Sequence, residues 1–411
     1  MNAMLALLPL LLGSQPESPV TLALPRGFTA EVAHFGVGPA RHLAVRDNGD
    51  VYVALSRPVE GSGIACLRDE DRDGIYEITQ YFGKVRGTGI AIRGEWLYFG
   101  EDSRIVRYRL PDDSLTPTGE PELIAHGFSE SRQHASKPID FGADGRLYIN
   151  IGAPSNACQE RDRTPGSPGM DPCPILESAG GIWAYDADTP NQKHPADGVR
   201  FATGLRNCVA MDAHGDAVYV TVHGRDQLDS LYPGLYNAAQ NAELPAEEMH
   251  RLTQGSDAGW PFTYYDGKQG KRVLAPEYGG DGSATPEEGK YQDPIQAFPA
   301  HWAPNGMVIY TGQQFPERYR GGAFVAFHGS WNRAPLPQAG YNVTFSPFVE
   351  GLPSGPYEIF ANGFAGSPDI PSPRDAQHRP MGLGVTPDGA LLIADSVGGM
   401  IWRITYTGTN E

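Results

Sequence analysis

The sequence has 411 residues, of which 40% are hydrophobic and 20% are charged, a composition typical of globular proteins. Its formal net charge of −17 argues against nucleic acid or an anionic membrane surface as a partner. The 51 glycines and 36 prolines occur without low-complexity tracts and with few long helical patterns, which indicates short strands joined by many tight turns.

The chain begins with an apolar run from Met4 to Leu12, which is too short to span a membrane. The run is similar to the apolar region of a secretory signal that ends near Gly13 or Ser14, although basic residues do not precede it. Residues 1–14 are therefore predicted to be a signal peptide, with a buried N-terminal strand as the alternative. No later segment approaches the length of a membrane span, so the predicted location is periplasmic or secreted.

Short strands preceded by turns recur along the chain. In "ADGRLYINIG", for example, Leu147, Ile149 and Ile151 alternate with Tyr148 and Asn150, which predicts a half-buried strand. Similar segments are "DNGDVYVALS", "RGEWLYFGED", "DAHGDAVYVTVHG", "GGAFVAFHGS" and "TPDGALLIADS". The first three of the six segments lie about 48 residues apart, the length of one four-stranded propeller blade.

Six such segments predict an all-β fold, a six-bladed β-propeller of four-stranded antiparallel blades that forms a single domain over residues 24–406. A β-sandwich would also contain many strands but does not explain the period. The early segment "GFTAEVAHF" is expected to pair beside "MIWRITY" in the last blade. This N-terminal strand would close the ring and remove the free sheet edges.

Four cysteines are present. Cys158 and Cys173 bracket the insert "CQERDRTPGSPGMDPC", and in an exported protein they are expected to form a disulfide. Cys66 and Cys208 lie in apolar strands and are expected to be buried free thiols.

Polar residues stand in the connections between the predicted blades. They are His134 in "RQHASK", Arg206 and Asn207 in "TGLRNC", His301 in "PAHWAPNG", Asn332 and Arg333 in "FHGSWNRAP", and Arg379 in "QHRPMGLGVTPDG". Loops on one face of a propeller converge on its central channel. Converging Arg and Asn side chains suit a planar anion with carboxylates, although each Arg by itself is equally explained by pairing with a surface acid, and His134 by capping a strand.

The ordered set "GLRN", "HGRDQL…EEMHRLTQGSDAGWPFTYYDG", "HWAPNG", "AFHGSWNR" and "RPMGLGV" resembles the soluble sugar dehydrogenases that depend on pyrroloquinoline quinone (PQQ). The resemblance extends from about Leu24 to Tyr406, and "HGSWNR" brings it closest to the sorbosone and pyranose dehydrogenase branch. It implies a six-bladed propeller and a quinoprotein that oxidises a sugar hydroxyl by hydride transfer to PQQ activated by calcium.

The resemblance also implies roles for single residues. His134 matches the catalytic histidine, which would act as general base. Arg206, Asn207, His301, Asn332 or Arg333, and Arg379 match positions that contact the cofactor. The carbonyls of Gly224 and Arg225 match ligands of the active-site calcium, and Glu248 with the carbonyl of Ala258 matches a structural calcium site.

The sequence departs from the family where Ala135, Ser136 and Lys137 follow the histidine in place of an aromatic residue, Thr and Arg. This departure makes the shape of the bound sugar an open question. A further calcium candidate is "DEDRDG", in which Asp69, Asp71 and Asp73 have the spacing of a calcium loop, but Gln80 at position twelve excludes an EF-hand.

Two other functions stay open at this point: a calcium-dependent lactonase or esterase, and a non-catalytic carbohydrate-binding propeller. The lactonase needs carboxylates around a central metal, whereas the connections carry Arg and Asn. No GxGxxG opens a helix after a strand, which disfavours a nicotinamide enzyme. Since no CxxCH is present, electrons are expected to leave to a separate acceptor, a cytochrome or a quinone-type carrier.

Overall fold

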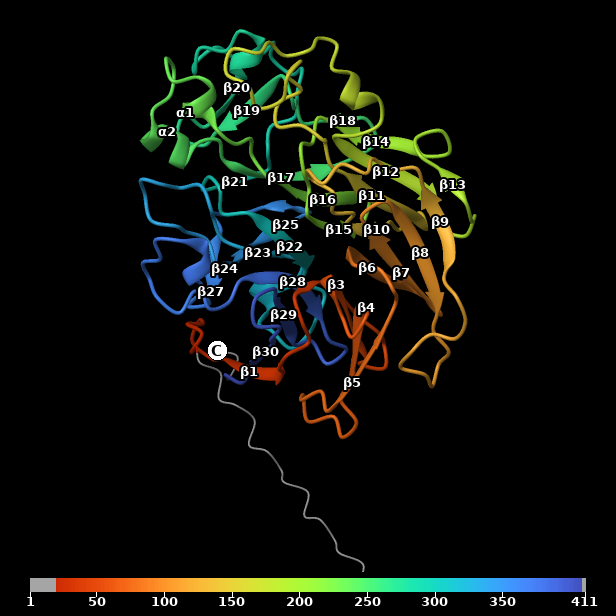
Figure 1. Ribbon diagram of the computed structural model, residues 1–411. Helices are drawn as coiled ribbons and strands as arrows, with labels where there is room; N and C mark the ends of the chain where they lie inside the picture. The colour runs from red at the N-terminus through yellow and green to blue at the C-terminus, as the bar shows by residue number, and fades with distance from the viewer. Residues whose placement is uncertain (1–19, 409–411) are drawn as a thin grey trace, which may run out of the picture.

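Six antiparallel sheets are arranged in a ring around a central axis (Figure 1). The computed structural model describes residues 20–408, so the predicted signal peptide at residues 1–14 lies outside the described residues. The six segments singled out by their repeat form the second strand of each sheet, and the prediction of a six-bladed propeller is confirmed. No helix among the described residues is long and apolar enough to cross a membrane.

The blades follow one another along the chain, each built from its innermost strand outward. Blade 1 consists of β2 (Ala40–Val45), β3 (Val51–Val59), β4 (Ser62–Arg68) and β5 (Ile78–Phe82). Blade 2 consists of β6 (Gly87–Arg93), β7 (Trp96–Glu101), β8 (Arg104–Arg109) and β9 (Glu122–His126). Blade 3 consists of β10 (Ile139–Phe141), β11 (Arg146–Ile151), β12 (Gly181–Asp186) and β14 (Val199–Thr203).

The remaining blades repeat this order. Blade 4 consists of β15 (Ala210–His214), β16 (Ala217–Val222), β17 (Glu247–Leu252) and β21 (Gln296–Phe298). Blade 5 consists of β22 (Pro304–Ile309), β23 (Ala323–Phe327), β24 (Asn342–Ser346) and β27 (Glu358–Ala361). Blade 6 consists of β28 (Pro380–Val385), β29 (Leu391–Asp395), β30 (Ile401–Tyr406) and β1 (Phe28–His34).

The ring closes as predicted, because β1 pairs antiparallel with β30 from Phe28 opposite Tyr406 to His34 opposite Ile401. Two blades are larger than the four strands expected. A short fifth strand runs parallel to the outer strand of each: β13 (Gln192–Lys193) beside β9, and β18 (Ser256–Asp257) beside β14.

The connections contain the remaining elements. They are α1 (Leu228–Leu231), α2 (Ala238–Glu243), the hairpins β19–β20 (Thr263–Asp266, Lys271–Leu274) and β25–β26 (Phe348–Val349, Leu352–Pro353), and four 3₁₀ turns at Pro174–Glu177, Pro276–Tyr278, Glu317–Tyr319 and Pro373–Asp375. The β19–β20 hairpin packs with α1 and its surroundings in a separate small core.

The main core lies between the blades, in six layers of buried side chains that each join two neighbours. In β11, Leu147, Ile149 and Ile151 pack against blade 2, and Tyr148 packs against blade 4. The prediction that this strand is half-buried was therefore wrong, since both of its faces are covered by neighbouring blades.

Cys158 and Cys173 form a disulfide, and Cys66 and Cys208 are buried free thiols. Both predictions about the cysteines are confirmed. The disulfide closes the insert between β11 and β12, one of several long connections at the same end of the ring.

Candidate active site

The predicted cofactor and base residues all lie in connections at one end of the ring, the end where the innermost strands begin. The connections lead from an outermost strand to the next blade, or join the second and third strands of a blade. They are residues 127–138 with His134, 204–209 with Arg206 and Asn207, 223–246 with Gly224 and Arg225, 299–303 with His301, 328–341 with Asn332 and Arg333, and 362–379 with Arg379. Glu248 and Ala258 lie instead on β17 and just after β18.

His134 is held in a fixed orientation. Its φ of 55° is in the left-handed region, and its Nδ1 lies 2.5 Å from the carbonyl oxygen of Ala153. Since a carbonyl can only accept, a neutral His134 carries its proton on Nδ1 and keeps the lone pair of Nε2 free. Gly152 allows this packing, because a Cβ there would lie 2.7 Å from the Cβ of His134.

The environment of His134 keeps the imidazole neutral. Burial, and then the positive charge of Arg206, lower the pKa of His134 well below its ordinary value. A half-buried neutral imidazole with a free Nε2 can accept a proton from a weakly acidic hydroxyl.

His134 borders a cavity of about 840 Å³, counted with its open mouth. Asn207, His223 and Asn305 line it as well. The side-chain oxygens of Asn207 and Asn305 are buried and have no hydrogen-bond partner among the described residues. Buried acceptors without partners are costly, so these two oxygens are suited to receive donors from a bound ligand.

Asp226 connects several of the predicted cofactor residues. Its carboxylate accepts hydrogen bonds from Arg206 (2.8 Å), Arg163 (3.0 Å) and Asn332 (3.0 Å). Although burial opposes ionisation, the charges of Arg206 and Arg163 lower the pKa of Asp226 to about 2. Asp226 was not predicted from the sequence, where its only signal is its place beside Arg225 in "HGRDQL".

Three other predicted cofactor residues tie the same loops together. Arg379 donates to the carbonyls of His328 and Gly329, both at 2.8 Å. Arg333 donates to the carbonyls of Ala242 and Ala300, and its buried Nε has no partner among the described residues. His301 Nε2 lies 2.7 Å from the carbonyl oxygen of Asn241. The loops are thus cross-linked by basic groups, of which Arg333 and Arg379 keep further donors for an anion.

The residues predicted to bind calcium already have protein partners. The Gly224 carbonyl accepts a hydrogen bond from Arg206 at 2.9 Å, and the Arg225 side chain pairs with Glu277. Glu248 accepts from Arg272 (2.5 Å) and His250 (3.0 Å). The Gly224 carbonyl keeps a second lone pair for a metal, whereas the charge of Glu248 is offset by Arg272. Calcium binding at Gly224, Arg225, Glu248 and Ala258 stays a prediction.

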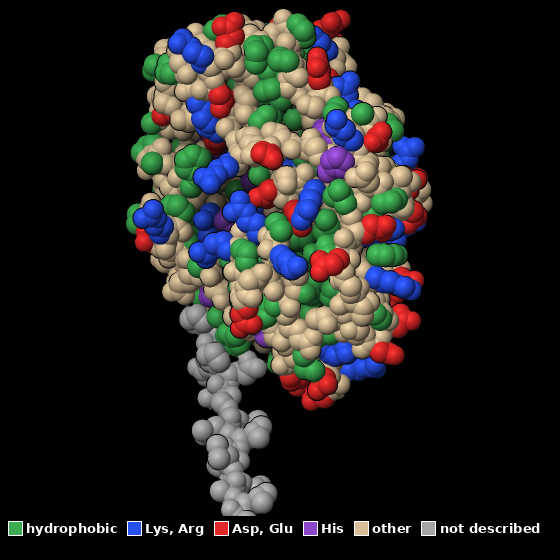
Figure 2. Space-filling model, turned by 45° about the vertical axis from the view of Figure 1, so that its right-hand side comes forward, with side chains coloured by type: hydrophobic (Ala, Val, Ile, Leu, Met, Phe, Trp, Pro, Cys, Tyr) green, Lys and Arg blue, Asp and Glu red, His purple; other side chains and the backbone are tan. Residues whose placement is uncertain are grey.

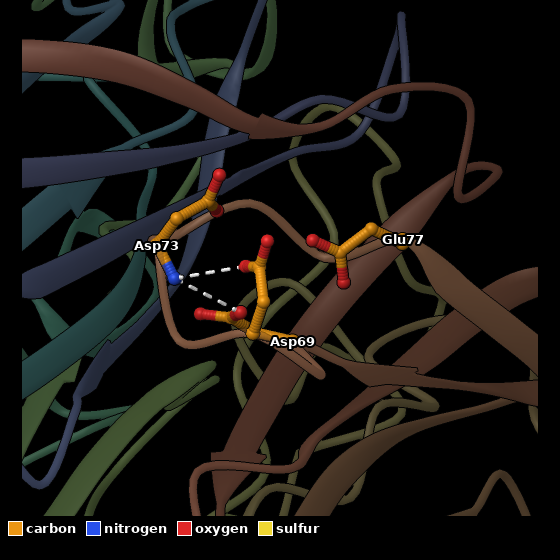
Figure 3. Close-up of side chains that lie close together, drawn as sticks. Asp69, Asp73 and Glu77 are labelled. Carbon is orange, nitrogen blue, oxygen red and sulfur yellow. Dashed lines mark hydrogen bonds between the residues drawn. The ribbon is translucent and has the colours of Figure 1, made fainter.

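The acidic turn between β4 and β5 lies at the opposite end of the ring from the cavity. Ligand atoms of Asp69, Asp71, Asp73 and Glu77 lie within 4.8 Å of one another. Figure 3 shows the backbone N–H of Asp73 directed at the carboxylates of its neighbours, and Asp69 Oδ1 and Asp71 Oδ1 each accept it at 3.2 Å. Exposed acidic turns form such hydrogen bonds without a metal as well, so calcium binding by this turn stays a prediction.

Comparisons with known proteins agree with this architecture. The family model described as TrAA12-like matches residues 22–407. A curated relative, an uncharacterized protein of Borreliella burgdorferi, is 29% identical over 209 residues, which is 50% of this chain and 48% of the relative. The matched segment thus spans about half the length of that relative.

Solved structures share the fold over nearly the whole chain. The carbohydrate-active enzyme family AA12 protein of Trichoderma reesei, in its iodide structure, is 18% identical with a TM-score of 0.75, covering 96% of this chain and 99% of that chain. The PQQ domain of pyranose dehydrogenase from Coprinopsis cinerea, in its holo form, is 17% identical with a TM-score of 0.73, covering 95% and 98%. The PQQ-bound aldose sugar dehydrogenase of Streptomyces coelicolor is 17% identical with a TM-score of 0.56, covering 93% and 99%.

Proposed function

This chain belongs to the TrAA12-like family, and from this premise and the geometry of the site we propose that it is a PQQ-dependent oxidoreductase that oxidises a sugar hydroxyl. The observation that carries the proposal is His134, a half-buried neutral imidazole whose Nε2 is free at a cavity where loops from several blades meet. The solved structures of the same fold include proteins described as PQQ-bound.

In this proposal Arg206, Asn207, His301, Asn332, Arg333 and Arg379 would hold the cofactor. The unpartnered Nε of Arg333 can donate to a carboxylate of the cofactor, and the unpartnered oxygens of Asn207 and Asn332 can accept from its N–H or O–H groups. When bound, PQQ accepts the hydride that leaves the sugar carbon. The carbonyls of Gly224 and Arg225 hold the calcium that accompanies it.

His134 removes the proton of the sugar hydroxyl. Its Nδ1–H donates to Ala153, so the ring cannot turn without losing this bond, and Nε2 stays directed at the substrate. A positioned base of this kind contributes roughly 10²–10⁴-fold in rate. Arg206 disfavours the protonated imidazole, which helps His134 to pass the proton on to water after the reaction.

The proposal includes a separate electron acceptor, a cytochrome or a quinone-type carrier, and a periplasmic or secreted location. The disulfide between Cys158 and Cys173 supports the location, since disulfides persist in oxidising compartments. The proposed reaction does not use the structural calcium predicted at Glu248 and Ala258, where Arg272 already offsets the charge of the Glu248 carboxylate.

The proposal is tested with purified apo-protein and an artificial electron-accepting dye. Addition of PQQ with calcium is expected to produce an absorption band of bound quinone and sugar-dependent reduction of the dye, and a chelator is expected to reverse the activation. Arg379→Ala should weaken PQQ binding more than it lowers stability. A protein that binds a sugar but never reduces the dye would instead be a carbohydrate-binding propeller.

A further inference from the structure

The cavity beside His134 is basic, although the protein as a whole is acidic. Its lining contains three arginines, Arg41, Arg86 and Arg132, against one carboxylate, Asp102, which gives 3 − 1 = 2 positive charges in a chain of net charge −17. Figure 2 shows Lys and Arg side chains gathered around a central hollow. A cleft lined by one sign of charge attracts ligands of the opposite sign.

Two of these arginines have no carboxylate partner among the described residues. Arg86 pairs with Asp102 at 2.9 Å. Arg41 donates only to hydroxyls, those of Thr88 (3.3 Å) and Ser136 (2.9 Å), and Arg132 has no ion pair with any described residue. Burial lowers the pKa of Arg41 to about 10, and the charge of Asp102 opposes this shift, so the guanidinium is charged at neutral pH. Arg41 is half-buried and makes no ion pair, which suits an anionic ligand, whereas Arg132 is exposed at the mouth of the cavity.

Both free guanidiniums are next to the proposed base. Arg132 precedes His134 by two residues, and Ser136, which holds Arg41, follows it by two. Of the proposed cofactor residues, Asn207 lines this cavity, whereas His301, Asn332, Arg333 and Arg379 do not, because they come from connections of blades 4 to 6. A group that contacts Arg41 and Arg132 is therefore apart from most of the proposed cofactor residues.

We propose that the substrate is an anionic sugar, one that carries a carboxylate or a phosphate away from the oxidised hydroxyl, and that Arg41 and Arg132 bind this group. Guanidinium forks bind carboxylate and phosphate oxygens with two parallel hydrogen bonds. The inference rests on the proposed function for the identity of the reaction, and on the cavity alone for the charge of the ligand.

Binding to the protein without cofactor tests the charge of the ligand separately from the reaction. D-glucose, D-glucuronate and D-glucose 6-phosphate are titrated calorimetrically into the wild type and into Arg41→Gln, Arg41→Lys, Arg132→Gln and the control Arg109→Gln, whose exposed side chain pairs with Glu95. At least one anion is expected to bind on the order of tenfold more tightly than glucose. Comparison of D-glucuronate with D-glucose 6-phosphate shows whether the site prefers a carboxylate or a phosphate. Both Gln variants should lose this preference, Arg41→Lys should keep part of it, and Arg109→Gln should keep all of it.

Turnover by the protein loaded with PQQ and calcium gives the second readout. The preferred anionic sugar should have a kcat/KM about tenfold above that of glucose, and the Gln variants should lose this advantage through a higher KM. Equal values for charged and neutral sugars would overturn the proposal. Weaker PQQ binding by the Gln variants would also overturn it, since the arginines would then hold the cofactor. Anion binding without turnover of any sugar would support the inference and refute the proposed function.

Discussion

His134 illustrates how one backbone contact sets the chemistry of a side chain. The Ala153 carbonyl fixes the proton on Nδ1, and burial next to Arg206 disfavours a second proton. The imidazole is thus a base over a wider range of pH than an exposed histidine would be.

This environment predicts the pH dependence of the reaction. A histidine with a lowered pKa is protonated only as the pH falls through that lowered value, so kcat/KM should keep its plateau down through pH 6.5, the ordinary pKa of histidine. The acid limb should appear below this pH in a rate profile of the loaded enzyme. An acid limb centred at or above pH 6.5 would contradict the account of His134.

Asp226 is the second residue on which the site depends. Asp226→Asn should lower the free energy of unfolding by about 3 kcal/mol, because it leaves the buried Arg206 without its counter-ion. Denaturation by urea measures this loss. Asp216→Asn is the matched control. Asp216 pairs with Arg251 but its side chain is 83% exposed, so the loss of this ion pair should change the stability little. Equal losses of stability in the two variants would show that the site does not depend on the Asp226 carboxylate.

At the scale of elements, half-buried carboxylates join the innermost strands across blades. Asp140 on β10 accepts the backbone N–H of Ala213 on β15 at 2.7 Å, and Asp212 on β15 accepts that of Ile309 on β22 at 2.9 Å. Burial, and then the charge of Asp212, raise the pKa of Asp140, and burial raises the pKa of Asp212. These bonds hold the inner strands in register around the channel.

The raised pKa values predict a stability that falls with rising pH. The folded state holds protons that the unfolded state releases above about pH 4. The stability that these protonated carboxyls contribute is therefore lost as the pH rises through their pKa values in the folded state. Asp140→Asn keeps an oxygen for the Ala213 N–H and removes the charge. The difference in melting temperature, variant minus wild type, should therefore be larger at pH 8 than at pH 5. A difference that does not change with pH would refute the account.

The sequence predicted the elements better than it predicted the contacts between them. The second strand of each blade was readable because a tight turn precedes an alternating apolar run, and the spacing of these strands led to the blade number. The two-residue strands β13 and β18 were not predicted, since two residues have no periodicity. The half-buried assignment of β11 failed because alternation does not show whether a second sheet covers the other face.

The candidate site could be predicted to the extent that its residues stand in recognisable motifs. His134 and Arg379 do, and both lie at the end of the ring where the connections meet, while their roles stay predictions. Asp226 was missed because its partners Arg163 and Asn332 are 63 and 106 residues away along the chain. Arg41 was missed because it lies on β2, where nothing in the local pattern distinguishes it from an outward-facing charge.

At the scale of the whole molecule, the ring depends on its N-terminal strand. Phe28 on β1 packs against Phe315, Tyr319, Phe360 and Tyr406 at centroid distances of 4.8 to 5.2 Å. It thereby joins blade 6 to blade 5 at the point where the two ends of the chain meet.

Phe28→Ala should lower the free energy of unfolding by about 2 kcal/mol, less than for a fully buried aromatic ring because Phe28 is only half-buried. Chemical denaturation measures the loss, and Leu352→Ala, which removes an exposed side chain, is the control. A loss no greater than that of Leu352→Ala would show that the closure does not depend on this ring of aromatic contacts.

The central claim is that His134 removes the sugar proton while the bound cofactor takes the hydride. Stopped-flow measurement of quinone reduction, in protein loaded with PQQ and calcium and mixed with sugar, tests it without any dye. We expect wild type and His134→Ala to bind PQQ equally well and to melt at similar temperatures, and the variant to reduce the cofactor at least about 10²-fold more slowly. Reduction by His134→Ala within a few-fold of wild type, or a wild-type protein that does not bind PQQ, would contradict the claim.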